Sequence, residues 1–198
     1  MTAQDALRAF VDAARTAYEA QGEDPRGRAS CGRIFAALEG PLTLREARPA
    51  RLPACAHLAQ AADPGRFAPG PLRDLVRAFG GLEPHLVWYR RGGDAPGASP
   101  GWEEAHANAM IVGPGGLVPE VRVWLGVSLL APHVRYPDHR HPPEETYLVL
   151  SEGEFWQEGR GWFSPGVGGS FYNPPNILHA MRSGEAPLFA FWALWATR

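Results

Sequence analysis

The stretch YPDHRHPPEETYLVLSEGEFW, residues 136–156, places two histidines, several acids and two tyrosines in a segment with the pattern of a strand and turns. Successive side chains of a strand point to opposite faces, so residues separated by even numbers could project to one side. The polar residues that meet this condition are His139, His141, Glu145 and Tyr147. Because Pro142 and Pro143 interrupt the strand after the histidines, we expect a bend there.

The second half of this stretch predicts a strand with one polar face. Glu145, Tyr147 and Val149 should face one side, whereas Leu148 and Leu150 should face the other. A carboxylate and a phenol that point into a barrel are costly unless they are paired or bound to a metal. Two imidazoles and a carboxylate that converge suit a divalent transition metal, and open coordination positions make such a site catalytic.

The first half of the chain predicts helices. Apolar residues recur at helical spacing within residues 1–20, and Thr2 or Asp5 is a possible N-cap. The segments SCGRIFAALEG and PLRDLVRAFGG predict two further helices, over residues 30–40 and 71–80. We therefore expect a helical region at the N-terminal end of the chain.

The pattern changes after RRGGDAPGASPG, which is rich in turn-forming residues. Short apolar runs then alternate with Gly and Pro, and the predicted strands lie in NAMIVGPGG, VRVWLGVSLLAP, ETYLVLSEGEFW, GGSFYNPPNILHAM and PLFAFWALW. Strands without intervening helices favour an antiparallel sandwich or barrel. The sequence thus predicts a mainly β protein, with a helical region over residues 1–100 packed on a β-barrel over residues 101–198. Trp192 and Trp195 should face opposite sides of the last strand, so at most one lines a pocket.

The amino-acid composition excludes some classes of function. The 19 basic residues are all arginine and the formal net charge is −2, so lysine chemistry is excluded and nucleic-acid binding is a poor expectation. There is no apolar run of the ~18 residues that a membrane span needs, and we expect a cytoplasmic protein with a small-molecule substrate and no membrane partner. Exposed barrel edges make a homodimer reasonable.

Two groups of residues resemble the two motifs of the cupin superfamily. They are His139-x-His141-x3-Glu145 followed by Gly153, and Gly168-x5-Pro174-x4-His179. The resemblance implies a small cupin β-barrel (a double-stranded β-helix or jelly roll) in which one metal is held by His139, His141, Glu145 and His179. The chain departs from the pattern at His133, where a glycine is usual, and at Ser183, where asparagine often ends the second motif.

A closer resemblance is to the bacterial cupin-type dimethylsulfoniopropionate (DMSP) lyases. It rests on the helical region before the barrel and on Tyr136, His139, His141, Glu145, Tyr147 and His179. The resemblance implies that Tyr147, two residues after the glutamate ligand, is the catalytic base, and that Tyr136 lines the substrate pocket. It further implies a metal-dependent carbon–sulfur lyase that releases dimethyl sulfide and acrylate by β-elimination.

The chemistry agrees with this reading. The proton to be removed lies beside a carboxylate, and a cation that binds the carboxylate stabilises the developing negative charge. A cation near a tyrosine also favours its phenolate, and an aromatic face can hold the sulfonium by cation–π attraction.

Two alternatives to the lyase remain open. The first is another metal-dependent cupin enzyme, such as a sugar isomerase or a dioxygenase, and the second is a non-catalytic small-molecule-binding cupin. An isomerase should have a polar pocket suited to hydroxyl groups, whereas a sulfonium lyase should have an aromatic one. Three histidines and a glutamate suit Zn, Fe, Mn, Co or Ni, so the ligand set does not choose the metal.

Overall fold

The computed structural model describes residues 1–197, so Arg198, the last residue of the predicted barrel segment, lies outside the described residues. The helices are α1 (Ala3–Gln21), α2 (Pro25–Ala37), α3 (Leu58–Ala61) and α4 (Pro71–Leu82), with short 3-10 segments η1 (Pro53–His57), η2 (Pro64–Arg66) and η3 (Glu83–His85). The strands are β1 (Trp88–Tyr89), β2 (His106–Val112), β3 (Val123–Leu130), β4 (Glu144–Val149), β5 (Glu154–Gln157), β6 (Gly161–Phe163), β7 (Ser170–Asn173), β8 (His179–Arg182) and β9 (Leu188–Trp195). No described helix is both long and apolar enough to cross a membrane.

Helix α1 begins where the sequence predicts. The Thr2 hydroxyl accepts a hydrogen bond from the Asp5 backbone N–H at 3.1 Å, and the Asp5 carboxylate accepts one from the Thr2 N–H at 3.1 Å. This reciprocal capping satisfies two backbone donors that a helix N-terminus otherwise leaves without partners. Both candidate caps therefore act together.

The predicted boundaries of the next two helices need correction. Helix α2 begins at Pro25 rather than residue 30, because the Asp24 carboxylate caps it by accepting the Arg26 N–H at 2.8 Å, and proline fits the first helical turn. The residue expected to open this helix, Ser30, is fully buried inside it. Helix α4 begins at Pro71 as expected but continues through Gly80, which weakens a helix without ending it.

All strands pair in two antiparallel sheets. One sheet has six strands in the order β1-β2-β3-β9-β4-β7, and the other has three in the order β6-β5-β8. Each of the five predicted strand segments overlaps at least one of these strands, whereas β1 and β6 are too short to give a pattern. The predicted fold class, a mainly β protein with a cupin barrel after a helical region, is confirmed.

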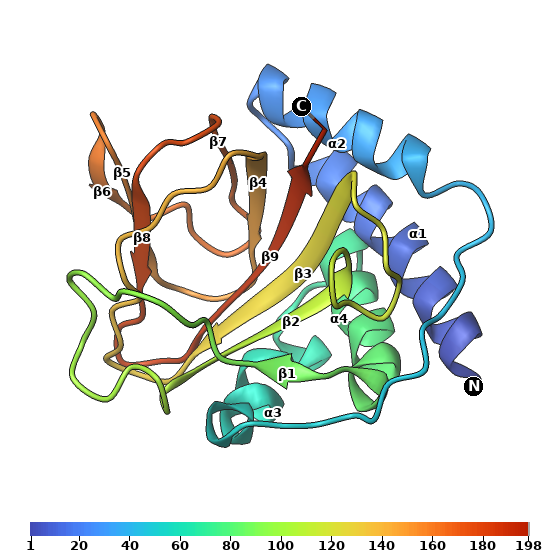
Figure 1. Cartoon of the computed structure of the whole chain (residues 1–198), viewed down its shortest axis with the longest axis horizontal. Coiled ribbons are helices and arrows are strands. Elements are labelled where there is room, and N and C mark those ends of the chain that lie inside the picture. Colours follow the sequence, from blue (N-terminus) through green and yellow to red (C-terminus); the bar gives the residue numbers. More distant parts are fainter. Residues whose placement is uncertain (198) are drawn as a thin grey trace.

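The helices cover the outer face of the six-stranded sheet, and the three-stranded sheet lies on its other side (Figure 1). Aromatic contacts join the helices to the sheet, with ring centroids 5.5 Å apart for Phe10 and Phe191 and 5.4 Å apart for Phe79 and Phe189. The helices thus bury one face of the large sheet and leave the other face for the barrel interior.

The two faces of β4 and β9 divide as predicted. Leu148 and Leu150 pack in the core under the helices, whereas Tyr147 and Val149 belong to a second core inside the barrel. Trp192 points into the barrel interior, and Trp195, three residues on, packs against the helix-side core. Gly153 of the first motif lies so close to a neighbouring strand that a Cβ there would be 2.4 Å from Leu188 Cδ1. The glycine therefore allows the turn after β4 to pack on β9.

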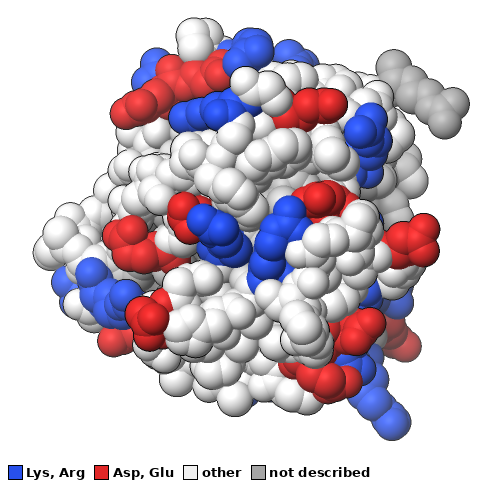
Figure 2. All heavy atoms as spheres, turned by 90° about the vertical axis from the view of Figure 1, so that its left-hand side faces the viewer, with Lys and Arg blue, Asp and Glu red and all other residues white. Residues whose placement is uncertain are grey.

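The surface over the three-stranded sheet carries acidic and basic side chains side by side (Figure 2). One ion pair on this sheet joins Arg182 Nε to Glu154 Oε2 at 2.6 Å, and the Arg182 guanidinium also lies over the Trp162 ring at 4.2 Å. Charges of both signs compensate locally on this face.

Candidate metal centre

The metal-site geometry begins with the loop between β3 and β4, which runs alongside β8. His139 and His179 face each other across this pairing and exchange two backbone hydrogen bonds, of 3.0 Å and 2.9 Å. Their side chains therefore leave the backbone on the same face, and their ring centroids are 4.0 Å apart. Residues 40 positions apart in sequence are brought together by one backbone pair.

Backbone carbonyl groups fix how each histidine ring presents its nitrogens. The Nδ1 atoms of His139, His141 and His179 lie 2.9, 2.9 and 3.0 Å from the carbonyl oxygens of Pro137, Pro143 and Ile177. A carbonyl oxygen only accepts, so each Nδ1 carries a proton, and in the neutral form of a ring the lone pair is on Nε2. This is the usual way in which proteins orient histidine ligands of metals.

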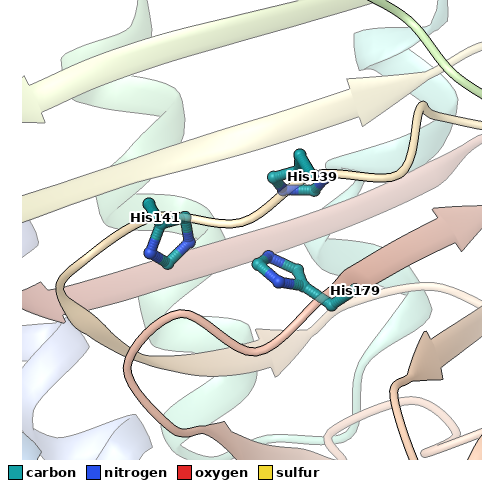
Figure 3. A group of neighbouring side chains, drawn as sticks. All are labelled: His139, His141 and His179. Atoms are coloured by element: carbon teal, nitrogen blue, oxygen red, sulfur yellow. The ribbon is translucent and has the colours of Figure 1, made fainter.

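The three histidines converge (Figure 3), with one potential ligand atom from each within 4.8 Å of the others. His139 and His141 come from the loop before β4, and His179 begins β8. The buried Nε2 of His179 has no hydrogen-bond partner among the described residues, which is costly for a polar atom unless a ligand satisfies it. The group could hold a metal ion, and the unpartnered nitrogen fits this use.

Glu145 adds a carboxylate to the three histidines. Its Oε2 lies 3.4 Å from His141 Nε2 and 3.3 Å from His179 Nε2. The same oxygen accepts a hydrogen bond from Asn173 Nδ2 at 2.9 Å, and the carboxylate is almost completely buried. The four predicted ligand residues are thus neighbours, although the bend at Pro142 and Pro143 puts the histidines outside the regular strand.

Burial and charge set the protonation states of this cluster. Burial, with a smaller contribution from the neighbouring His179, lowers the pKa of His139 to about 3. For Glu145, burial opposes ionisation, but His141 and His179 hold the carboxylate pKa well below its usual value. Burial likewise opposes the charged form of His141, yet the Glu145 carboxylate raises its pKa. An anionic Glu145 beside a neutral His139 is a donor set suited to a divalent cation.

A small pocket of about 240 Å³ opens beside these residues. Its lining includes Tyr89, Trp124, Tyr136, Tyr147 and Trp192 as aromatic residues, together with Met110, Met181 and Leu194. The polar lining residues are Arg91, Asn108, Ser128, His139, His141 and Glu145. The volume is below the range typical of drug-sized ligands, so the pocket suits a small molecule with an apolar part.

The two predicted tyrosines lie on different walls of this pocket. The Tyr147 ring stacks on Phe171 with centroids 5.1 Å apart, and burial raises the pKa of its phenol well above the usual value, with a further increase from Glu145. Tyr136 packs edge-on against His139, and burial raises the pKa of its phenol as well. Both phenols are held in their neutral form by the protein alone.

Histidines outside the predicted motifs have structural roles. His106 is fully buried, its Nδ1 lies 2.7 Å from the Trp102 carbonyl oxygen, and its Nε2 accepts the Arg91 N–H at 3.0 Å. His133, at the position where the cupin motif usually has glycine, has a positive φ of 60° and lies 3.4 Å from Glu185 on the surface. The structure thus places His133 at a turn and not at the site.

Several pocket residues had no signal in the sequence. Asn108, Ser128 and Arg91 line the pocket, and Asn173 contacts Glu145, but each stands alone in a strand or loop without motif spacing. Of these residues, Asn173 was the easiest to predict. It lies two residues after Phe171, so on a regular strand the two side chains point to the same face.

A larger groove of about 1020 Å³ lies elsewhere, between the α1–α2 junction and the segment that joins β6 to β7. It is open and polar, and the histidine cluster does not line it. Phe163 and Phe171, whose ring centroids are 5.1 Å apart, line the groove and belong to the barrel core. The groove therefore borders the barrel core, but the smaller pocket is the one lined by His139, His141 and Glu145.

The fold and the histidine cluster define a cupin barrel with a potential metal centre. A family model described as dimethylsulfoniopropionate lyase matches residues 26–190, so the chain belongs to the DMSP lyase family. DMSP lyase DddQ of Ruegeria pomeroyi is 30% identical over 162 residues, which cover 81% of this chain and 78% of that protein. A putative DMSP lyase DddL of Cereibacter sphaeroides is 29% identical over 134 residues, or 67% of this chain and about half (54%) of that protein.

Solved structures share the fold of the whole chain. A chain from crystal structures of the DMSP lyases RdDddP and RnDddQII has a TM-score of 0.77 at 24% identity, covering 98% of this chain and 94% of that chain. The crystal structure of DddQ from Ruegeria pomeroyi has a TM-score of 0.75 at 22% identity, covering 96% and 91%. The likeness therefore extends over the helices as well as the barrel.

Proposed function

We propose that the protein is a metal-dependent carbon–sulfur lyase that cleaves DMSP to dimethyl sulfide and acrylate by β-elimination. The observation that carries the proposal is that His139, His141 and five aromatic residues line one pocket of about 240 Å³. Such a pocket offers a cation site for a carboxylate and π-faces for a sulfonium. Membership of the DMSP lyase family and the likeness to DddQ support the same substrate.

The residues that would hold the metal are His139, His141, Glu145 and His179. Support comes from the three Nε2 lone pairs that the backbone carbonyls leave free, and from the Glu145 carboxylate beside two of them. A bound divalent cation supplies Lewis acidity that stabilises negative charge developing next to a carboxylate at the site. With an ion that takes more than four ligands, these four residues would leave a position open for a substrate oxygen.

Tyr147 would act as the base. It follows Glu145 on the inward face of β4, so its hydroxyl shares the pocket with the proposed ligands. In the reaction, the phenolate takes a proton from the carbon beside the substrate carboxylate, the electron pair forms the C=C bond, and the C–S bond breaks. Dimethyl sulfide leaves with the electrons of that bond, which neutralise its sulfonium charge, and acrylate remains.

The surroundings of Tyr147 explain why this base needs a cation. Burial and the Glu145 carboxylate both raise the phenol pKa, so the protein alone keeps it protonated. An adjacent positive charge acts in the opposite direction and favours the phenolate. Stacking on Phe171 meanwhile keeps the ring in place during proton transfer.

The lining supports a sulfonium over a sugar as substrate. A hydroxyl-rich ligand needs several free hydrogen-bonding groups, whereas Asn108 and Ser128 already bond each other and most of the other polar lining residues are the proposed metal ligands. The pocket also offers the indole faces of Trp124 and Trp192. Indole faces attract cations by roughly 0.5–2 kcal/mol. The pocket is therefore better suited to a trimethylammonium-like or sulfonium group than to a sugar.

The test is release of dimethyl sulfide, measured by gas chromatography of the headspace, with DMSP and protein loaded separately with Zn, Fe, Mn, Co or Ni. We expect release with at least one metal, equimolar acrylate in solution, and loss of both after chelation. The proposal would be contradicted if the protein, loaded with each of these metals in turn, never released more dimethyl sulfide than the chelated control.

A further inference from the structure

Four buried side chains in the pocket wall form one chain of hydrogen bonds. Trp192 Nε1 donates to Ser128 Oγ at 3.0 Å, and Ser128 Oγ donates to Asn108 Oδ1 at 2.6 Å. Asn108 Nδ2 then donates to the Tyr136 hydroxyl at 3.1 Å. The chain crosses three adjacent strands, β9, β3 and β2, and ends on the loop that carries His139.

The donors and acceptors of this chain agree with one another in direction. An indole N–H can only donate, so Ser128 must accept from Trp192 and direct its own proton elsewhere. That proton meets the amide oxygen of Asn108, since an amide oxygen only accepts. The amide NH₂ of Asn108 therefore points to Tyr136, whose hydroxyl oxygen accepts.

Backbone register holds the first members of the chain in place. Asn108 and Ser128 lie directly opposite each other on β2 and β3, and Gly126 lies opposite Trp192 on β3 and β9. A Cβ at Gly126 would lie 2.2 Å from the indole ring, so only glycine lets the indole lie against the strand. The Trp192 indole N–H, which is the first donor of the chain of hydrogen bonds, is thus held in place by close packing.

The Tyr136 ring has little freedom to move away from this chain. It packs edge-on against Trp102, His106 and His139, with centroid distances of 5.5, 5.3 and 5.2 Å. Among residues 1–197, its hydroxyl has Asn108 as donor and no protein acceptor for its own proton. Because the hydroxyl lines the pocket, that proton is available to a ligand there.

We infer that Asn108 is a positioning residue: by occupying the Tyr136 hydroxyl oxygen as a donor, it makes Tyr136 a hydrogen-bond donor to a carboxylate bound in the pocket. The identity of this carboxylate, that of DMSP and of acrylate, rests on the proposed function. Tyr136 thereby differs in role from Tyr147, for which residues 1–197 provide no such chain of donors. Ser128 and Trp192 act through Asn108 by fixing which end of its amide faces the tyrosine.

Asn108→Asp tests the direction of the chain, because a carboxylate would accept the Tyr136 proton and withdraw it from the pocket. The readout is the dissociation constant of acrylate from metal-loaded protein, measured by isothermal titration calorimetry. A hydrogen bond to a charged group is worth roughly tenfold or more in affinity, so we expect a loss of that size in Asn108→Asp and in Tyr136→Phe. Asn108→Ala, which introduces no charge, should lie between the parent and Asn108→Asp.

The double variant Asn108→Ala with Tyr136→Phe separates positioning from a general structural effect, because neither change adds a charge that would itself repel acrylate. If Asn108 acts through Tyr136, the double variant should bind acrylate as Tyr136→Phe does, within about twofold, because the two effects are not independent. Gln60→Glu, an exposed amide-to-acid change, is the matched control and should bind as the parent does. Metal content, measured for each variant, should stay at the parent value in Asn108→Ala, whose thermal midpoint should fall because buried partners are left unsatisfied but should remain above the assay temperature.

Three results would overturn the inference. They are unchanged acrylate affinity in both Asn108 variants, additive losses in the double variant, and failure of the metal-loaded parent to bind acrylate at all. Failure of the proposed function is distinguishable from these results. Acrylate binding with the expected coupling, but without release of dimethyl sulfide from DMSP, would keep the role of Asn108 and reject the lyase reaction.

Discussion

Asn173 lies directly opposite Glu145 on the neighbouring strand, and its Nδ2 donates a hydrogen bond of 2.9 Å to Glu145 Oε2. The amide is itself oriented, because Gln157 Nε2 donates to Asn173 Oδ1 at 2.6 Å and to the Tyr172 carbonyl oxygen at 2.9 Å. Glu145 therefore has one fixed partner on the strand side, and its carboxylate is held toward His141 and His179. Groups that orient a metal ligand in this way contribute to metal affinity without touching the ion.

Asn173→Ala should accordingly weaken metal binding. Removal of a partner that orients a ligand costs about 10–100-fold in metal affinity. Competition with a chromophoric chelator measures the affinity, and Gln60→Ala, which removes an exposed amide, is the matched control. An Asn173→Ala protein with the parent affinity would mean that Glu145 does not depend on this contact, or is not a ligand.

His179→Ala should abolish stable metal binding. His179 supplies the buried nitrogen that lacks a protein partner, so its loss removes a ligand while the other two histidines stay on their loop. Elemental analysis after dialysis against a chelator should show less than a tenth of the parent metal content, by the general loss expected for a removed ligand. His57→Ala, in segment η1, should retain the parent content, and full occupancy in His179→Ala would refute the proposed ligand set.

The metal-free protein should lose stability in acid partly through His139. Burial lowers the pKa of this imidazole to about 3 from its ordinary value of 6.5, so between these values the unfolded chain binds the proton and the folded protein does not. The free energy of unfolding therefore falls as the pH falls through this window, by at most about 1.4 kcal/mol per pH unit for one group.

The comparison that isolates this group uses His139→Gln, which cannot titrate. Urea unfolding in the presence of a chelator, at pH 6.5 and pH 5, should show a smaller decrease in His139→Gln than in the parent. Equal decreases in the two proteins would show that His139 is protonated in the folded state as readily as in the unfolded chain.

The inward face of β4 could be predicted from the sequence because the alternation of side chains along a strand depends only on neighbouring residues. Glu145 and Tyr147 share a face as long as the strand between them is regular. The convergence of His139 with His179 depends on a backbone pairing over 40 positions, and only motif resemblance indicated it. Asn108 and Ser128 could not be predicted, since an amide and a hydroxyl become partners only once strand register is set. The start of α2 was missed because its cap, Asp24, and the proline that follows lie before the segment predicted to be helical.

Tyr147→Phe should remove turnover and keep the protein intact. The change deletes the hydroxyl but retains the ring, which stacks on Phe171 at 5.1 Å and packs against Phe155 at 5.4 Å. Loss of a general base typically lowers the rate by ~10²–10⁴-fold, more than the loss of one hydrogen bond. Release of dimethyl sulfide at saturating DMSP measures the rate, with metal content and thermal midpoint checked in parallel.

Two other tyrosines serve as controls for this change. Tyr172→Phe loses a hydroxyl that donates to Glu144 at 2.6 Å, outside the pocket, and should retain the parent rate. Tyr136→Phe removes a donor to the ligand, so its main effect should be a higher KM, with a smaller decrease in kcat than in Tyr147→Phe. A rate for Tyr147→Phe within about threefold of the parent would exclude it as the base. A larger decrease in kcat for Tyr136→Phe would exchange the two roles, because the group that takes the proton must limit the chemical step more than the group that binds the carboxylate.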